Sequence, residues 1–377
     1  MSMNKARQIY EDLGVVPVIN ASGYQTVIGG SRVGTEVQAA MDIANRYFAD
    51  MEELLKKTGA IIADTLGAEA AMVTPGCAAA LALSSAACMS GSDPEKMEQL
   101  PDTTGMKHHI LIQKKQRYHY DPVLSIFGAK LIEVGDENGT TEAQLEAAIS
   151  DQTAAIHYFA PGGQAGVLPP EDVVRIAHAN GIPVIVDAAS QVYPLETMLK
   201  YPAMGADLIG YGAKYIGSCH STGILCGRKD LIDAAFLHSF IGYETCPYDT
   251  IGRPLKVDRQ EVIAVVVALR EWFSMDHEAR LSEYKRKSEE LLSNLKDIPH
   301  ITAKFSSDSR SLSNGVHITV DETALGKTAA QIIEELRQGN PSVWTRGSAN
   351  TFRVAVTNFI EDDQEIVTAR LREVLTT

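Results

Sequence analysis

The chain contains 377 residues, with 34 Lys and Arg against 48 Asp and Glu, which gives a formal net charge of −14 at pH 7. This acidic excess disfavours general nucleic-acid binding, because proteins hold phosphate backbones mainly with basic side chains. Hydrophobic residues make up 45% and charged residues 22%, values that exclude a wholly disordered or collagen-like chain. The length predicts one large domain together with a smaller one.

The cysteines and the N-terminal segment indicate the compartment. Five scattered cysteines include no C-x-x-C pair, a pattern typical of thiols in a cytosolic protein. Residues 1–14 are charged and lack the apolar core of a signal peptide. The most membrane-like stretch, 70–89, contains Pro, Gly and Ser, whereas a spanning helix needs about 20 predominantly apolar residues. We therefore expect a cytoplasmic protein that does not enter a membrane.

The first two hundred or so residues alternate between strand and helix patterns. A short extended segment at 17–21 and a glycine-rich turn precede an amphipathic helix, which is expected from 35 to about 59. Further helices are expected at 77–89, 141–149 and 170–180. Strands are expected at 70–74, 109–113, 129–134, 153–159, 183–187, 208–211 and 223–226. This alternation predicts βαβ units and an α/β fold with a mostly parallel sheet.

After residue 246 the pattern changes to that of an α+β domain. Its elements are expected to be a helix at 256–273, a polar helix at 277–296, antiparallel strands within 300–320, a helix at 328–339, a strand at 351–356 and a closing helix at 362–375. The domains are therefore expected to be an N-terminal arm and helix at 1–50, a large domain at 51–255, and a linking helix with a small α+β domain at 256–377.

Several common motifs are absent or incomplete. No full dinucleotide-binding, P-loop, H-E-x-x-H or G-x-S-x-G sequence occurs. His108 and His109 are adjacent at the start of a strand, where neighbouring side chains point to opposite faces. We therefore expect no metal site.

Three features that do carry chemistry occur in one order. The segment 74–80, Thr-Pro-Gly-Cys-Ala-Ala-Ala, predicts a strand, a tight turn and a helix of small residues, where a phosphate can bind the helix N-terminus. Tight helix–sheet packing would select the same residues. Asp187 ends an apolar strand, where ligands of open α/β sheets bind, and the alternative is an aspartate that caps a turn. Lys214 follows another strand among small residues and is either a Schiff-base lysine or a solvated loop lysine.

Together, a phosphate cup, a strand-end Asp and a later Lys resemble the fold-type-I pyridoxal-phosphate enzymes. Within them, the chain resembles the selenocysteine-synthase-like branch, which includes amino-sugar-acid ammonia-lyases. The segments that carry this likeness, besides those around Asp187 and Lys214, are 18–23 (Val-Ile-Asn-Ala-Ser-Gly), 29–31 (Gly-Gly-Ser) and 252–257 (Gly-Arg-Pro-Leu-Lys-Val), followed by Gln260-Glu261. The resemblance implies an aspartate-aminotransferase-like fold with a seven-stranded, mostly parallel sheet.

The resemblance also implies roles for individual residues. Lys214 would form a Schiff base with pyridoxal 5′-phosphate, and Asp187 would keep the pyridine nitrogen protonated so that the ring withdraws electrons. Ser190 would reach the phenolic oxygen of the cofactor. His119 is the residue expected to stack on the ring, and its neighbours Tyr118 and Tyr120 are rivals. The phosphate would be held by three backbone N–H groups, those of Gly76, Cys77 and Ala78.

Other positions depart from the family pattern or leave alternatives open. Tyr211-Gly212-Ala213 replaces a hydroxyl- or imidazole-bearing group before the lysine, which removes one expected phosphate contact. The polar segment 218–221 either supplies acid–base groups, including to a neighbouring subunit, or caps a turn. Arg346 and Arg353 are both candidates to bind a substrate carboxylate bidentately, and either could instead form a structural ion pair.

The function implied is α,β-elimination from a hydroxylated amino acid, such as the amino sugar acid D-glucosaminate 6-phosphate, to give a 2-oxo acid and ammonia. The alternative is a transferase, either an aminotransferase or one that transfers selenium to seryl-tRNA. A non-catalytic binding protein is disfavoured because Asp187 and Lys214 are both present. The expected partners are a small-molecule substrate and further copies of the chain, with segments 29–32 and 243–256 completing the site of a dimer partner.

Overall fold

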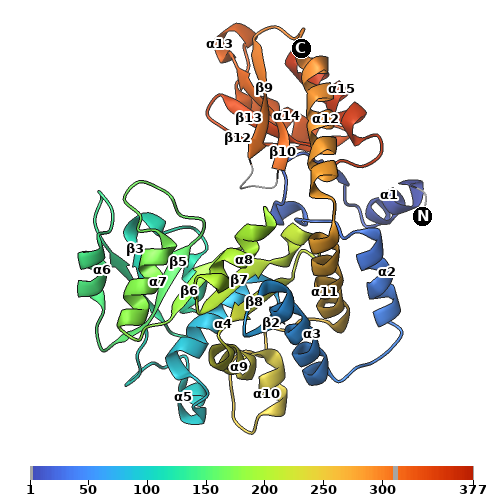
Figure 1. Cartoon of the computed structure of the whole chain (residues 1–377). Coiled ribbons are helices and arrows are strands. Elements are labelled where there is room, and N and C mark those ends of the chain that lie inside the picture. The colour runs from blue at the N-terminus through green and yellow to red at the C-terminus, as the bar shows by residue number, and fades with distance from the viewer. Residues whose placement is uncertain (1–2, 309–312, 377) are drawn as a thin grey trace. The chain divides into compact units, whose positions relative to one another are not determined.

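The computed structural model describes residues 3–308 and 313–376, which divide into two compact units. One unit, here called the large unit, is Arg32–Ser274. The other, the small unit, joins Met1–Ser31 to Met275–Thr377 (Figure 1). Within the described residues, no helix has both the length and the apolar character that crossing a membrane requires.

A seven-stranded sheet forms the centre of the large unit, in the order β2-β8-β7-β6-β5-β3-β4. In that order the strands span Ala70–Thr74, Gly223–Gly227, Leu208–Gly212, Val184–Asp187, Thr153–Phe159, His109–Gln113 and Lys130–Val134. β8 is antiparallel to both of its neighbours, and the other neighbouring strands are parallel. The prediction of a mostly parallel seven-stranded sheet in an α/β fold is therefore confirmed.

Helices cover both faces of this sheet. Helix α4 (Gly76–Ser90) packs across β5, β6, β7 and β8, and most of its side chains are buried. Its small residues allow this approach, because the backbone of Gly210 in β7 lies against Cys77 and Ala80. The next residue of β7, Tyr211, points to the opposite face and donates a hydrogen bond of 2.7 Å to Met198 O in α8 (Leu195–Ala203).

The other helices of the large unit surround this core (Figure 1). They are α2 (Thr35–Ala44), α3 (Met51–Leu66), α5 (Pro94–Gln99), α6 (Glu142–Ala148), α7 (Pro170–Ala179), α9 (Lys229–Leu237), α10 (Phe240–Thr245) and α11 (Arg259–Ser274). Short 3₁₀ helices occur at Lys114–Gln116, Asp121–Ser125 and Ala213–Ile216, and the last of these, η4, contains Lys214.

The single helix expected from 35 to about 59 is wrong, because α2 ends at Ala44 and α3 begins at Met51. The Asp50 carboxylate accepts a hydrogen bond of 3.0 Å from the backbone N–H of Glu53. This N-cap satisfies one of the unpaired N–H groups of the first helical turn and so starts a new helix. Amphipathic spacing alone does not reveal the break.

The small unit contains a four-stranded antiparallel sheet in the order β12-β13-β10-β9. These strands span Arg346–Ser348, Thr351–Ala355, Ser313–Val320 and Ile301–Asp308. Alternate residues of β10 and β13, among them Ile318 and Phe352, are fully buried against α12 (His277–Leu295), α14 (Ala329–Gln338) and α15 (Asp363–Thr376). This small antiparallel sheet with its helices agrees with the α+β organisation predicted for the C-terminal region.

The N-terminal segment belongs to the small unit through a strand pairing. β1 (Val18–Asn20) runs parallel to β11 (Ser342–Trp344), with Ile19 opposite Val343. The segment begins with α1 (Met3–Asp12), and the short helix α13 (Glu322–Leu325) follows β10.

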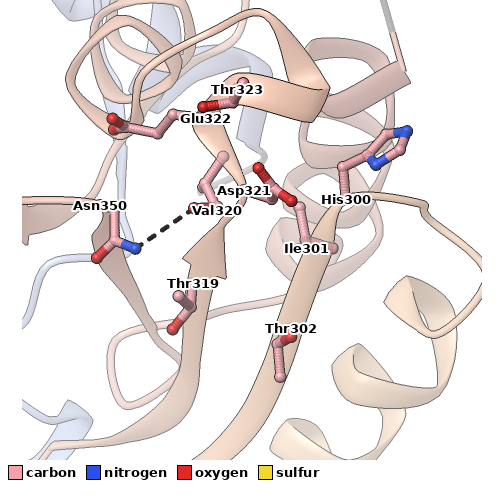
Figure 2. Close-up of a pocket in the computed structure, with 9 residues that line it drawn as sticks. All are labelled: His300, Ile301, Thr302, Thr319, Val320, Asp321, Glu322, Thr323 and Asn350. Carbon is pink, nitrogen blue, oxygen red and sulfur yellow. Dashed lines mark hydrogen bonds between the residues drawn. The ribbon is translucent and has the colours of Figure 1, made fainter.

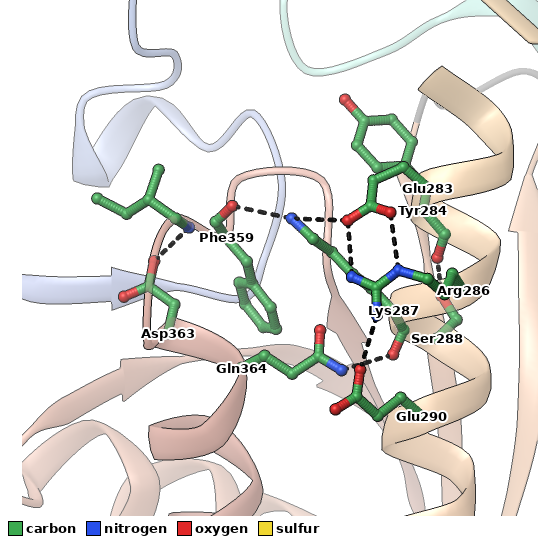
Figure 3. Close-up of polar contacts among 10 residues, drawn as sticks. Glu283, Tyr284, Arg286, Lys287, Ser288, Glu290, Phe359, Asp363 and Gln364 are labelled. Atoms are coloured by element: carbon green, nitrogen blue, oxygen red, sulfur yellow. Dashed lines mark hydrogen bonds and ion pairs between the residues drawn. The ribbon is translucent and has the colours of Figure 1, made fainter. Parts of the chain in front are cut away.

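Polar contacts join α12 to the segment that precedes α15 (Figure 3). The Lys287 ammonium donates to Phe359 O at 3.2 Å, and the Gln364 amide donates to Lys287 O at 3.0 Å. On the same helix Arg286 forms ion pairs with Glu283 and Glu290. The first two contacts link residues far apart in the sequence, and they fix the start of α15 against α12.

The N-cap at Asp50 generates a stability prediction. Replacing Asp50 with Ala removes the acceptor for the Glu53 N–H, so we expect the free energy of unfolding to fall by about 1 kcal/mol. Asp64→Ala, at an exposed position within the same helix, is the matched control and should be neutral or slightly stabilising. Urea denaturation measures both variants, and equal losses would contradict a capping role for Asp50.

Candidate active site

Asp187 lies at the carboxyl end of the central strand β6, with only 4% of its surface exposed. It is paired with Gly210 of β7, so its side chain points to the same face of the sheet as α4. A carboxylate in such a position needs polar partners, because burying an uncompensated charge is costly.

Three donors from different elements reach this carboxylate. The backbone N–H of Ala189 donates to Oδ1 at 3.0 Å, and the Cys77 thiol donates to the same oxygen at 3.6 Å. The Tyr118 hydroxyl donates to Oδ2. A carboxylate has about four lone-pair positions, so these donors leave room for one more. None of these three donor groups carries a positive charge.

Tyr118 is held in place by two further aromatic rings. Its ring stacks on Phe159 with centroids 4.1 Å apart, and its hydroxyl lies 3.3 Å from Nε2 of the fully buried His157. Burial, followed by the charge of Asp187, raises the pKa of Tyr118 far above its usual value, so the phenol remains a proton donor. Burial lowers the pKa of His157 to about 4 and raises that of the Cys77 thiol. Asp187 is therefore surrounded by neutral groups at neutral pH.

Lys214 lies in η4, directly after β7. Burial lowers the pKa of its ammonium below the usual value for lysine, which favours the neutral, nucleophilic amine. Its Nζ is 5.1 Å from the centre of the Tyr215 ring. Burial, together with the nearby Cys77 and Asp187, raises the pKa of Tyr215 to about 12, so this ring lies near the lysine and within the influence of the carboxylate. The solvated loop lysine considered from the sequence does not describe this environment.

The start of α4 forms a narrow cradle of backbone. Gly76, its first residue, has a φ of 85°. Gly223 of β8 approaches so closely that a Cβ there would lie 2.4 Å from the carbonyl carbon of Gly76 and 2.7 Å from the nitrogen of Cys77. Only backbone therefore occupies this corner, where the first N–H groups of the helix, including those of Cys77 and Ala78, lack intrahelical acceptors. Such a helix N-terminus binds phosphate.

Residues 218–221 form the turn after Lys214, and the two roles considered for them were acid–base chemistry and capping of the turn. The Ser218 and Thr222 hydroxyls lie 3.2 Å apart within the turn, and the Ser221 hydroxyl donates to the carboxylate of Glu261. These contacts cap the turn. His220 differs, because burial and then the charge of Lys214 lower the pKa of its imidazole. His220 is therefore the member of this segment with an electrostatic link to the lysine.

The structure brings some of the predicted residues together and leaves others apart. The Asp187 carboxylate, the Cys77 thiol and the cradle at Gly76 form one group, and Ser190 lies half-buried in the turn after β6. His119 is exposed, and its ring makes an edge contact with Tyr120. Tyr118, one of its two rivals, is the residue beside Asp187.

Arg346 and Arg353 belong to the small unit, where they are cross-strand neighbours on β12 and β13. On the sheet of the large unit, the sequence analysis did not identify His157 as part of the Asp187 network. A polar signal was present there, since His157 is a titratable residue in the otherwise apolar strand at 153–159.

These residues fit pyridoxal phosphate. The first N–H groups of α4, including those of Cys77 and Ala78, would hold the phosphate. The remaining lone-pair position on Asp187 would accept a protonated ring nitrogen, and the half-buried amine of Lys214 would be available to the cofactor's carbonyl carbon. When bound, the cofactor withdraws electrons from the Cα of an amino acid attached to it.

Comparisons with known proteins give a consistent set of relatives. The family model Aminotransferase class-V matches residues 50–353. A 5′-C-glycyluridine monooxygenase-decarboxylase from a Streptomyces species is 32% identical, over 97% of this chain and 92% of that protein. The D-glucosaminate-6-phosphate ammonia lyase of Salmonella typhimurium is 28% identical over 97% of both chains. An L-seryl-tRNA(Sec) selenium transferase of Clostridium perfringens is 25% identical, over 95% of this chain and 82% of that protein.

Solved structures agree with these relatives. A structure of D-glucosaminate-6-phosphate ammonia-lyase superposes with a TM-score of 0.84 at 27% identity, and the match covers 98% of both chains. An aspartate aminotransferase from Thermus thermophilus matches with a TM-score of 0.53 at 16% identity, over 99% of this chain and 95% of that one, which shows a shared fold.

The hydroxyl of Tyr118 generates a prediction that separates it from His119. Tyr118→Phe keeps the ring but removes a donor to a buried carboxylate, so the free energy of unfolding of the cofactor-free protein should fall by about 1–3 kcal/mol. The affinity for pyridoxal phosphate should fall as well, because Asp187 loses its orientation. His119→Ala, at an exposed position, should change neither quantity measurably. Urea denaturation and absorbance titration with the cofactor measure these effects; equal effects in the two variants would contradict the assignment.

Proposed function

The chain belongs to the aminotransferase class-V family of pyridoxal-phosphate enzymes, and from this premise we propose that it is an ammonia-lyase acting on a hydroxylated amino acid. The single observation that carries the proposal is the full-length similarity, in sequence and fold, to D-glucosaminate-6-phosphate ammonia-lyase. The arrangement of Asp187, Lys214 and the cradle at Gly76 supports it, since elimination needs an electron-withdrawing cofactor and a nearby base.

The comparisons confirm the family and the cofactor that the sequence predicted. The selenocysteine-synthase-like relatives predicted from segments such as 252–257 are present among the matches. The alternative of a transferase has weaker support, because the selenium transferase relatives are less similar in sequence than the lyase. The roles of individual residues below are our proposals.

Lys214 acts as the proton carrier. Its amine, with a pKa lowered by burial, is neutral at a lower pH than an exposed lysine and removes the proton from the Cα of the substrate. The resulting ammonium is correspondingly a better proton donor. Asp187 holds the ring nitrogen in its protonated form, while Tyr118 and Cys77 fix the orientation of that carboxylate.

His220 passes the proton to the leaving group. Its imidazole lies within the electrostatic range of Lys214 and, with a lowered pKa, is neutral at neutral pH; once protonated, it releases the proton more readily than an ordinary imidazolium. The β-hydroxyl then leaves as water when this proton reaches it, as the bond between Cβ and oxygen breaks. Hydrolysis of the released product consumes one water and gives a 2-oxo acid and ammonia, so atoms and protons balance.

The substrate class is suggested by the names of two relatives. D-glucosaminate 6-phosphate and 5′-C-glycyluridine are both amino acids attached to a hydroxylated sugar chain. We propose the same class for this chain. Arg346 and Arg353 remain the candidates for binding the substrate carboxylate, and Tyr118 replaces His119 as our proposed ring-stacking residue because it lies beside Asp187.

The reaction type is tested without an added 2-oxo acid acceptor. Enzyme loaded with pyridoxal phosphate and mixed with D-glucosaminate 6-phosphate, or a related hydroxylated amino acid, should release ammonia and a 2-oxo acid continuously over many turnovers. The Lys214→Ala protein should lose at least about a thousandfold in turnover, because it lacks the proton carrier. Coupled ammonia detection, together with a 2-oxo acid assay, measures both proteins.

Two outcomes would contradict elimination. A single stoichiometric release of 2-oxo acid that restarts only on addition of another 2-oxo acid would make the protein an aminotransferase. Consumption of dioxygen with release of carbon dioxide in place of ammonia would place it with the monooxygenase-decarboxylase. An oxygen electrode and a carbon dioxide assay on the same mixtures distinguish these cases.

We also propose that the enzyme is a dimer. An apolar surface on α2 and the segment before α3 includes Ile43, Tyr47 and Phe48, and it lines a hollow of about 370 Å³. Phe48 is 94% exposed, an unusual state for a large apolar ring unless another surface covers it. Segments 29–32 and 243–256 remain our candidates for completing the site of the partner.

Sedimentation of the loaded enzyme tests this proposal. The unaltered chain should sediment as a dimer at micromolar concentration, and Phe48→Asp should shift it towards the monomer by placing a charge in the apolar surface. Ile360→Asp, at another exposed apolar position, is the control and should leave the assembly unchanged. A fully active monomer would contradict a shared site.

A further inference from the structure

Three consecutive ring-bearing residues lie shortly after β3, namely Tyr118, His119 and Tyr120. The hydroxyl of Tyr118 donates to Asp187, whereas the other two residues are exposed. Because the three rings are adjacent in sequence, a shift of the segment by one residue would bring a different ring to the carboxylate. The place of Tyr118 therefore depends on contacts that fix the backbone around it.

Before Tyr118, the segment is fixed to β5 by the side chain of Gln116, of which only 1% is exposed. Its amide nitrogen donates to Phe159 O at 2.9 Å, and its amide oxygen accepts a hydrogen bond from the Phe159 N–H at 3.3 Å. Phe159 also carries the ring that stacks on Tyr118. The two bonds of Gln116 therefore hold the segment beside the ring against which Tyr118 packs.

After Tyr118, the segment is fixed by the buried carboxylate of Asp121. Its Oδ2 accepts hydrogen bonds from the backbone N–H of Tyr118 at 3.0 Å and from Nε of Arg117 at 2.6 Å, and its Oδ1 accepts one from Nη2 of Arg117 at 3.1 Å. The backbone N–H of Asp121 donates in turn to Tyr118 O at 3.2 Å. The backbone N–H and the carbonyl of Tyr118 are thus both bonded to Asp121.

Arg117 orients the Asp121 carboxylate and ties it to the sheet. Its guanidinium donates two roughly parallel bonds to Asp121, an arrangement that is specific in geometry, and a further one to Glu133 of β4. Burial by itself would raise the pKa of Asp121, but the hydrogen bonds from Arg117 and from the Tyr118 N–H outweigh it and lower that pKa below its usual value. The carboxylate is therefore ionised and paired at neutral pH.

We propose that Asp121 is a positioning residue for the cofactor and acts through Tyr118. By bonding both the N–H and the carbonyl of Tyr118, it selects that ring, in place of its two neighbours in sequence, to pack against Phe159 and to contact Asp187. The proposal rests on the proposed role of Tyr118 beside the ring of pyridoxal phosphate, and it holds for any reaction that the cofactor supports. Arg117 supports this role by keeping the Asp121 carboxylate in one orientation.

The test measures the affinity of the full chain for pyridoxal phosphate by absorbance titration, and the orientation of the bound cofactor by visible circular dichroism. Asp121→Asn keeps the shape of the side chain, but its amide nitrogen cannot accept a hydrogen bond from Arg117. We expect the affinity to fall about tenfold, because buried donors lose their acceptor, and the dichroism of the bound cofactor to change. Arg117→Lys keeps the charge but loses the parallel bonds, and a smaller loss in the same direction is expected.

A second substitution shows whether Asp121 acts through Tyr118. Tyr118→Leu removes the ring and the hydroxyl, so adding Asp121→Asn to it should weaken cofactor binding by less than about twofold, since coupled residues are not additive. Asp321→Asn is the matched control. Asp321 also accepts a backbone N–H, that of Ala324 at 3.1 Å, but it is exposed in the wall of a hollow of the small unit (Figure 2). This control should change neither the affinity nor the dichroism.

Three results would overturn the proposal: unchanged affinity and dichroism in Asp121→Asn, an equal loss in Asp321→Asn, or the full tenfold loss persisting in the Tyr118→Leu protein. The last result would show that Asp121 stabilises the large unit without acting through Tyr118. If Asp121→Asn does not fold, Arg117→Lys is compared in the same way, alone and with Tyr118→Leu. Failure of the proposed function looks different, because no ammonia is then released while the Tyr118-dependent loss of cofactor affinity remains.

Discussion

The arrangement of the large unit depends on one buried carboxylate, that of Asp187. Its charge at the end of β6 is compatible with the apolar interior only because Ala189, Cys77 and Tyr118 donate to it from three separate elements. Each donor in turn requires a local structure. Cys77 reaches Asp187 because α4 packs tightly over Gly210, and Tyr118 is held by Phe159 and His157. The small residues of α4 allow the close packing that brings the start of the helix to the carboxylate, and we propose that the same start of the helix holds the phosphate.

Charge is distributed unevenly in this acidic chain, and the distribution matches its chemistry. In the large unit, the three side-chain and backbone donors to Asp187 are neutral, so none of them would compete as a cation with a protonated ring. In the small unit, two arginines, Arg346 and Arg353, are directly opposed on neighbouring strands of one sheet. A net charge of −14 therefore gives little information about ligand preference, because an anionic small molecule responds to the local field of a face rather than to the total.

The sequence specified the strands of the large sheet closely, because short apolar runs end at strong turn signals such as Pro75-Gly76 and Gly135. It also identified Asp187 and Lys214, since polar residues at the ends of buried strands are rare. Other features depend on contacts that are distant in sequence. Three consecutive rings at 118–120 are equivalent in sequence, and only packing against Phe159 distinguishes Tyr118. The pairing of Arg346 with Arg353 requires the register of two strands, which a reading of either segment alone does not supply.

The relatives of this chain are named for elimination, selenium transfer and oxygenation, so their shared fold and family do not by themselves select a reaction. Each of these reactions can begin with removal of the Cα proton, a step that Asp187 and Lys214 can support. The product then depends on which acceptor reaches the electron pair left at Cα. A β-hydroxyl leaves only if a proton arrives as its bond breaks, and this demands an acid–base group near Lys214. We propose His220 for this role, because the hydroxyls of Ser218 and Ser221 are engaged with Thr222 and Glu261, while the imidazole of His220 responds to the lysine charge. On this proposal, the choice of elimination depends on the turn that comes directly after the lysine.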